Sequence, residues 1–75
     1  MEKEKKLCFL DASGDELFSI LDGEFIELIY GNGCYCVSIC QYVDEDHFKL
    51  DGCLWEFRAF AERMKKSGII YRPYS

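Results

Sequence analysis

Proline, histidine and long apolar runs are scarce in this sequence. Pro73 is the only proline and His47 the only histidine among 75 residues. No apolar run approaches the about 20 residues that cross a bilayer. The first six residues, Met-Glu-Lys-Glu-Lys-Lys, lack the apolar core and the small-residue cleavage site of a signal peptide. We therefore expect a cytoplasmic protein without membrane contact, with a disordered, charged N-terminus over residues 1–6.

No repeat, linker or low-complexity segment divides the chain, so we expect one small domain over residues 1–75. Hydrophobic residues make up 49% and charged residues 31%, a composition typical of a chain that folds. The length excludes dinucleotide-binding sheets, eight-stranded barrels and kinases, because each of these folds needs a longer chain.

Positive charge is nearly absent from the middle of the chain. Residues 11–57 carry eleven acidic side chains and only Lys49, whereas residues 58–75 carry five basic side chains and only Glu62. The formal net charge is −5. Nucleic acids are bound through clustered Lys and Arg, so this distribution argues against direct nucleic-acid binding. It suits a protein partner with a basic surface, and a charge that serves only to keep the chain in solution is the alternative interpretation.

The sequence contains five cysteines but none of the usual cysteine motifs. The odd number and the expected reducing compartment favour free thiols over disulfides. Zinc sites commonly use a C-x₂-C spacing, whereas Cys34 and Cys36 would lie about 6.7 Å apart along a strand. A zinc site that includes His47 is therefore the weaker alternative, and we expect neither metal nor cofactor. His47 also lacks a recognisable nucleophile and orienting group, so we expect no enzymatic activity.

A β-hairpin is the clearest local prediction. Residues 24–30 and 34–43 flank Gly31-Asn32-Gly33, and Asn-Gly favours a tight turn because both central residues adopt positive φ. With Asn32-Gly33 as a two-residue loop, one face is wholly apolar and contains Ile26, Leu28, Tyr30, Tyr35, Val37 and Ile39. The opposite face is then mixed and contains Phe25, Glu27, Ile29, Cys36, Ser38 and Cys40.

Short segments outside this hairpin add to the sheet. Leu7–Leu10 predicts an edge strand, His47–Leu50 a third strand of the meander, and Ile69–Arg72 a last strand before the proline. The segment that follows Ser13 has the spacing of a helix capping box, but its apolar pattern fits a short helix or a strand equally well. Residues 7–21 therefore stay open between the two.

An amphipathic helix is predicted near the C-terminus. Its apolar stripe recurs at helical spacing and consists of Phe57, Phe60, Ala61 and Met64, extended by Leu54. The helix is expected to begin at Cys53 or Leu54, to run to about Ser67 and to end at Gly68. We therefore expect an α+β fold, in which an antiparallel hairpin or meander of three to four strands packs its apolar face against this one C-terminal helix.

Acidic and aromatic side chains are the expected partner-binding residues. Asp44, Glu45 and Asp46 form a polar turn, for which a plain solvated turn is the alternative interpretation. Tyrosine and tryptophan at the edge of a domain are common interface anchors, and the alternative is that these residues widen a small core. The candidate residues are Glu24, Glu27, Tyr42, Asp44, Glu45, Asp46, His47 and Trp55.

Two motifs resemble a known family. Tyr42-Val43-Asp44-Glu45-Asp46-His47 and Phe60-Ala61-Glu62-Arg63-Met64, followed by Gly68, Tyr71 and Pro73, are similar to motifs of the large polyvalent protein-associated domains of the YodL-like group. Those domains occur in mobile elements and phages of gut Clostridia, and the likeness covers about residues 17–74. Glu56 and Ala59 stand where the family has a histidine and a glutamate, so no role of those positions is carried over.

The resemblance implies a domain without established catalytic activity, carried on proteins that accompany mobile DNA and protect it or counter host defences. We therefore expect a phage or mobile-element accessory protein, of the anti-CRISPR or anti-restriction type, that covers the basic channel of a host nuclease. One alternative is a structural domain that forms a homodimer through its hairpin edge or its mixed face, burying Phe25, Ile29, Cys36 and Cys40. The other is the zinc-binding domain.

Overall fold

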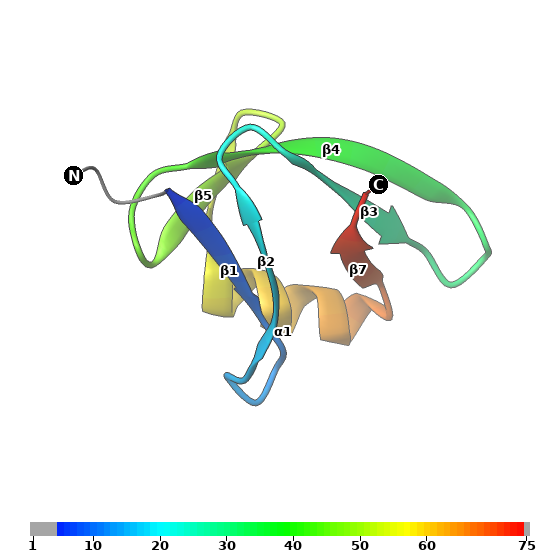
Figure 1. Cartoon of the computed structure of the whole chain (residues 1–75). Coiled ribbons are helices and arrows are strands. Elements are labelled where there is room, and N and C mark those ends of the chain that lie inside the picture. Colours follow the sequence, from blue (N-terminus) through cyan, green and yellow to red (C-terminus); the bar gives the residue numbers. More distant parts are fainter. Residues whose placement is uncertain (1–4, 75) are drawn as a thin grey trace.

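The computed structural model describes residues 5–74, which form seven strands and one helix in two antiparallel sheets (Figure 1). The elements are β1 (Lys6–Leu10), β2 (Glu16–Leu21), β3 (Phe25–Ile29), β4 (Tyr35–Tyr42), β5 (His47–Leu50), β6 (Cys53–Glu56), α1 (Phe57–Ser67) and β7 (Ile70–Pro73). β1 pairs with β2, and the other strands form a five-stranded sheet in the order β6-β5-β4-β3-β7. The α+β class is confirmed, but the sheet is larger than the expected three to four strands.

Strands β1 and β2 form a hairpin, so the segment after Ser13 is a strand and not a helix. Asp11 Oδ1 accepts hydrogen bonds from the backbone N–H groups of Ser13 (2.9 Å) and Asp15 (3.0 Å). These bonds close a turn, and Ser13 therefore caps no helix. The expected disorder of residues 1–6 is wrong at Lys6, which begins β1, while residues 1–4 lie outside the described residues.

The β3–β4 hairpin is confirmed, but the predicted register is wrong by one residue. Ile29 pairs with Tyr35, and Tyr30 lies in the loop. The loop spans five residues because the Tyr30 N–H donates to the Cys34 carbonyl (2.8 Å) and the Gly33 N–H donates to the Tyr30 carbonyl (3.0 Å). Since side chains alternate along a strand, this shift turns every β4 side chain to the face opposite the predicted one.

The true register leaves the more apolar face of this hairpin outside. The inward side chains are Ile26, Leu28, Cys36, Ser38 and Cys40, of which Cys36 is half-buried and the others are buried. The outward ones are Phe25, Glu27, Ile29, Tyr35, Val37 and Ile39. The predicted mixed face is therefore wrong: Phe25 and Ile29 point outward, whereas Cys36 and Cys40 face the core.

Strand β6 occupies the segment predicted as the first helical turn. Asp51 and Gly52 both have positive φ, at 49° and 85°, which is the conformation of a two-residue hairpin loop. The chain therefore reverses there, and Cys53 pairs with Leu50 of β5. Leu54 is consequently a strand residue with 61% of its surface exposed, and it does not extend the helical stripe.

Helix α1 buries the predicted stripe but packs on other partners than expected. Phe57, Phe60, Ala61 and Met64 are buried, and Gly68 ends the helix with a φ of 69° and an N–H bond to the Lys65 carbonyl (3.1 Å). The helix contacts β1 and β6 rather than lying across the β3–β4 hairpin. The two-stranded sheet adds to the same core, since β1 contacts β4 and β2 contacts β7.

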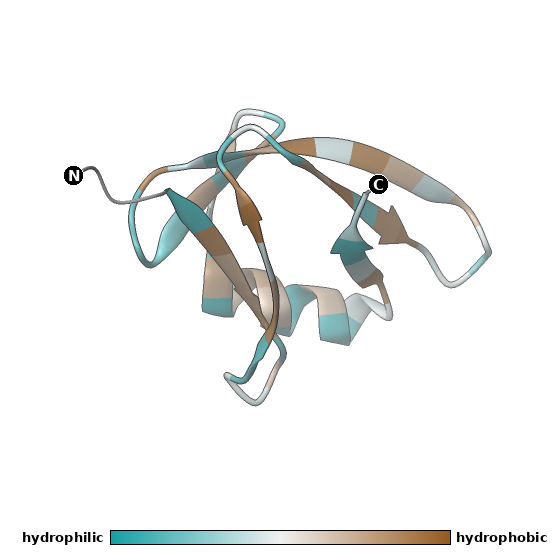
Figure 2. Ribbon diagram, in the orientation of Figure 1, coloured by the Kyte–Doolittle hydropathy of each residue, from teal (hydrophilic) through white to brown (hydrophobic). Residues whose placement is uncertain are grey.

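Aromatic rings form the centre of the core. The Phe9 ring of β1 lies 4.9 to 6.1 Å, between ring centroids, from five other rings: Phe18, Phe48, Phe57, Phe60 and Tyr71. The Tyr71 hydroxyl also donates to the Leu10 carbonyl and so joins β7 to β1. Figure 2 shows the same division along the ribbon, with hydrophobic segments on β1 to β4 and hydrophilic ones in the turns.

Candidate functional site

The outward side of β7, β3 and β4 carries three rows of residues set by the strand register. From β7 to β4, the rows are Ile70–Ile29–Tyr35, Arg72–Glu27–Val37 and Tyr74–Phe25–Ile39. Tyr74 follows β7 and continues its pairing, because its N–H donates to the Phe25 carbonyl (3.1 Å). We refer to these nine residues as the outer face.

Seven of the nine residues of the outer face are apolar or aromatic. Ile70 and Tyr35, at opposite ends of one row, have 64% and 62% of their surface exposed. Phe25, Val37 and Tyr74 are exposed as well. Contiguous exposed apolar side chains are typical of protein interaction sites, because a monomer gains nothing by leaving them in water.

An ion pair occupies the middle row of the outer face. Arg72 Nε donates to Glu27 Oε2 over 2.7 Å, and 15% of the Glu27 side chain is exposed, against 62% for Arg72. The pair leaves the outer face without net charge, although the whole chain carries −5. Glu27 is therefore part of an apolar surface with a neutral centre and not of an acidic one.

The predicted acidic turn connects β4 to β5 and is organised by Asp44. Its Oδ1 accepts hydrogen bonds from the backbone N–H groups of Asp46 (2.8 Å) and His47 (2.8 Å), and it lies 2.9 Å from His47 Nδ1. The side-chain hydrogen bond from His47, followed by that from the Asp46 backbone, holds the pKa of Asp44 below its ordinary value. The same side-chain bond raises the pKa of His47 above 6.5.

Replacing Asp44 with asparagine is expected to lower the pKa of His47 towards its ordinary value. The asparagine carbonyl can still accept the backbone N–H bonds, so the turn persists while the charge disappears. The pKa is measured from the histidine ring resonances in an NMR titration. Glu45→Gln is the matched control, because Glu45 is not among the groups that shift His47, and it should leave that pKa unchanged. An unchanged pKa in the Asp44→Asn variant would contradict the pairing.

The sign of the pH dependence follows from these two shifts. The bond between Asp44 and His47 contributes to folding in full between the ordinary pKa values of 3.8 and 6.5. It is lost as the pH rises through the raised pKa of His47, and also as the pH falls through the lowered pKa of Asp44.

Glu45 and Asp46 line a hollow of about 380 Å³ together with Glu56, Arg58 and the apolar floor around Phe57. Three carboxylates and one guanidinium therefore meet at this acidic hollow. It brings together two of the predicted partner-binding residues and adds Glu56, which sequence reasoning did not select. A hollow of this charge suits a lysine or arginine side chain of a partner.

Three other predicted residues help to hold the fold. Glu24 Oε1 accepts a hydrogen bond from the Leu21 N–H (2.6 Å) and so braces the β2–β3 turn. Tyr42 is half-buried against the core. Trp55 is half-buried too, and its ring lies 5.4 Å from that of Phe60. The predicted residues thus lie in several places: the outer face, the end of β4, the acidic turn, the β2–β3 turn and β6.

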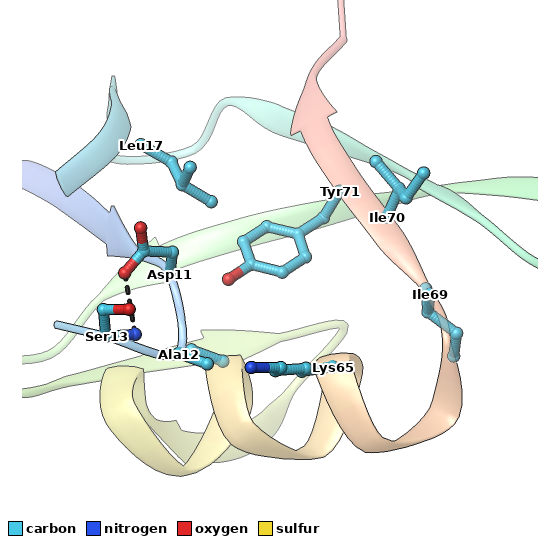
Figure 3. Close-up of a pocket in the computed structure, with 9 residues that line it drawn as sticks. Asp11, Ala12, Ser13, Leu17, Lys65, Ile69, Ile70 and Tyr71 are labelled. Carbon is cyan, nitrogen blue, oxygen red and sulfur yellow. Dashed lines mark hydrogen bonds between the residues drawn. The ribbon is translucent and has the colours of Figure 1, made fainter. Parts of the chain in front are cut away.

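A groove of about 460 Å³ lies between the β1–β2 turn, α1 and β7 (Figure 3). Leu17, Ile69 and the Tyr71 ring give it apolar walls, and Asp11 and Lys65 lie at its rim. Asp11 is engaged with backbone N–H groups of its own turn, and the Tyr71 hydroxyl with Leu10. These polar groups serve the fold, so the groove offers apolar contact and the Lys65 ammonium rather than an acid–base pair.

The cysteines are spread over the fold. Cys40 is buried, Cys8 and Cys36 are half-buried, and Cys34 and Cys53 are exposed. Among residues 5–74, no group of three His, Cys, Asp or Glu side chains has the arrangement to hold a metal ion. In the same part of the chain, no helix is long and apolar enough to cross a membrane.

Comparison with known proteins finds no matching family model, curated protein or solved structure. The resemblance to the YodL-like domains therefore remains a prediction from two motifs. The structure places the first motif at the β4–β5 turn and the second in α1. Function has to be inferred from the surfaces described above.

Proposed function

We propose that this chain is a non-enzymatic protein-binding module and that the outer face is its main docking surface. The observation that supports this is that the β3–β4 hairpin turns large apolar side chains to solvent and a serine to the core. Ser38 faces the core, while Phe25, Tyr35 and Val37 face solvent. Covering apolar surface contributes about 25 cal/mol per Å², so a partner that fits this face gains affinity from it directly.

The chemistry of the outer face defines the partner it suits. Tyr35, Tyr74 and Phe25 are large side chains that lose little conformational entropy when they are fixed, as interface anchors commonly are. The ion pair between Glu27 and Arg72 gives the centre a polar contact without net charge. The matching surface is therefore apolar, with a small polar centre of its own.

A second candidate function is inhibition of a CRISPR or restriction nuclease in the cytoplasm of a bacterial host, as the family resemblance implies. The acidic hollow favours this candidate, because the carboxylates of Glu45, Asp46 and Glu56 can receive a basic side chain of the nuclease. In this role the protein would act as a counter-defence inhibitor of phage or mobile-element origin, and it would contact the nuclease rather than the nucleic acid.

One binding experiment with two variants tests both candidates. The tagged full chain is assayed against purified CRISPR and restriction nucleases and other candidate partners. In the outer-face variant, Tyr35→Ser with Val37→Ser, affinity should fall about tenfold or more, because two anchors are lost. The acidic-hollow variant, Glu45→Lys with Asp46→Lys, should retain the binding. Leu54→Ser, which changes an exposed apolar residue on β6, two strands away from the outer face, is the control.

The outcomes separate the two surfaces. Loss of nuclease binding in the acidic-hollow variant alone, strongest at low salt, would favour the inhibitor over the apolar docking module. A partner that binds the wild type and both variants equally would contradict both candidates. Circular dichroism of each variant establishes that its fold is intact.

A further inference from the structure

We propose that the outer face binds a second copy of this chain in a two-fold symmetric dimer, with the axis parallel to the strands and between β3 and β7. This inference rests on the proposed function and names the partner. The reason is that the three rows of the outer face, which the strand pairing sets, are complementary to a second copy of themselves. A symmetric dimer uses the same patch on both copies, so that if residue i contacts residue j, then j also contacts i.

This axis places β3 of one copy over β7 of the other and keeps the rows aligned. Phe25 then faces the partner's Tyr74, Glu27 faces the partner's Arg72, and Ile29 faces the partner's Ile70. Each contact joins side chains of matching chemistry: aromatic with aromatic, acid with base, and isoleucine with isoleucine. The five-stranded sheets of the two copies would then be stacked about 10 Å apart, as in a β-sandwich.

The charges of the middle row select this axis over the other one. A two-fold axis across the strands would reverse the rows and place Glu27 over the partner's Glu27, so two like charges would be buried together. The axis parallel to the strands forms two crossed ion pairs instead. Arg72 uses Nε for its bond to Glu27, and a guanidinium has four further N–H donors for the partner's carboxylate.

The net charge argues for the outer face as the place where two copies meet. Each copy carries −5, so acidic surfaces of two copies repel each other, whereas the outer face has no net charge. Only β3 and β7 stack on the partner, so two strands about 4.8 Å apart and five residues of about 3.4 Å each give a contact of roughly 10 by 17 Å. The outward residues of β4 lie at the rim of this contact. This contact is several times smaller than the standard interface of about 800 Å² per partner, so we expect a weak dimer that forms only at high protein concentration, in roughly the range of 0.1 to 1 mM.

Charge-swap variants test the dimer directly. In Glu27→Arg, positions 27 and 72 are both positive, and in Arg72→Glu both are negative. Each variant alone should associate at least about tenfold more weakly than the wild type, because like charges then face each other across the interface. An equimolar mixture of the two should restore association as a heterodimer. Sedimentation equilibrium and native mass spectrometry measure the masses.

Matched controls separate this effect from net charge and from misfolding. Glu62→Arg and Lys66→Glu make the same charge changes on exposed positions of α1, away from the outer face. Both controls should associate like the wild type. Because rescue in the mixture requires two folded chains, it cannot arise from unfolding of a single variant.

Three results would overturn the dimer. One is a wild type that stays monomeric up to about 1 mM. Another is association of the single variants at wild-type strength, and the third is a mixture that stays monomeric although both variants are folded. The proposed function fails separately: a monomeric wild type whose binding to another protein is lost in the Tyr35→Ser, Val37→Ser variant rejects the dimer but supports the module.

Discussion

Replacing Phe9 with alanine is expected to lower the free energy of unfolding by about 3–5 kcal/mol. Phe9 is 1% exposed and its ring contacts rings from β2, β5, α1 and β7, so a single side chain connects both sheets and the helix. Its truncation removes apolar burial and leaves a cavity that four elements cannot easily close. A domain of 75 residues is stable by roughly 4–11 kcal/mol, so this variant should lose a large share of its stability.

Urea unfolding followed by tryptophan fluorescence measures this loss. Trp55 packs against Phe60 at the border of the same cluster and therefore reports its disruption. Phe25→Ala is the matched control, because it removes the same ring from the outer face, where Phe25 is 45% exposed, and it should lower the free energy of unfolding by only about 1 kcal/mol. The measurement is made at a protein concentration at which the chain is monomeric. Equal losses in the two variants would contradict the assigned core.

The local signals in the sequence predicted several elements correctly. The helical stripe of Phe57, Phe60 and Met64 is buried, and Gly68 ends the helix, because periodicity and a C-terminal glycine depend on few other parts of the chain. The β3–β4 hairpin, β5 and β7 also follow from apolar segments between turn residues. None of these signals contains information about which elements pack together.

The elements that the sequence misplaced depend on the choice between competing turns. Asn32-Gly33 was the stronger hairpin signal by composition, yet the backbone of Tyr30 and Cys34 closes a longer loop, while Asp51-Gly52 forms the two-residue loop. Reading Asp51-Gly52 as a hairpin turn would have revealed β6. The register was not fixed by hydrophobicity either, because both faces of the β3–β4 hairpin are largely apolar.

The one-residue error in the predicted β3–β4 register also changes which residues form the candidate site. The sequence pattern predicts Tyr35, Val37 and Ile39 in the core, whereas in the structure they line the outer face beside Phe25 and Ile29. Ile70, Arg72 and Tyr74 reach the same surface only through the pairing of β7 with β3, a contact between residues far apart in the sequence. The predicted acidic turn is present at the β4–β5 connection because it depends on neighbours alone.

The reactivity of Cys40 is expected to report the register in solution. In the structure Cys40 is buried, and burial, with a smaller contribution from the negative charge of Asp51, raises its pKa from 9.0 to about 12. The thiolate is the reactive form, so the raised pKa lowers its population near neutral pH, and burial also keeps the alkylating reagent away from the sulfur. In the register predicted from the sequence, Cys40 would lie on the outward face and react readily.

Alkylation with iodoacetamide, followed by peptide mass spectrometry, gives the rate at each cysteine of the native chain. Cys34 and Cys53 are exposed and should be modified first, while Cys40, which is buried, should react at least about tenfold more slowly. In concentrated urea all five cysteines should react at similar rates, which controls for peptide detection. The Phe9→Ala variant should expose Cys40 more often, because opening of the core is then more frequent. Rapid native modification of Cys40 would contradict the register, and with it the outer face on which both the docking surface and the dimer depend.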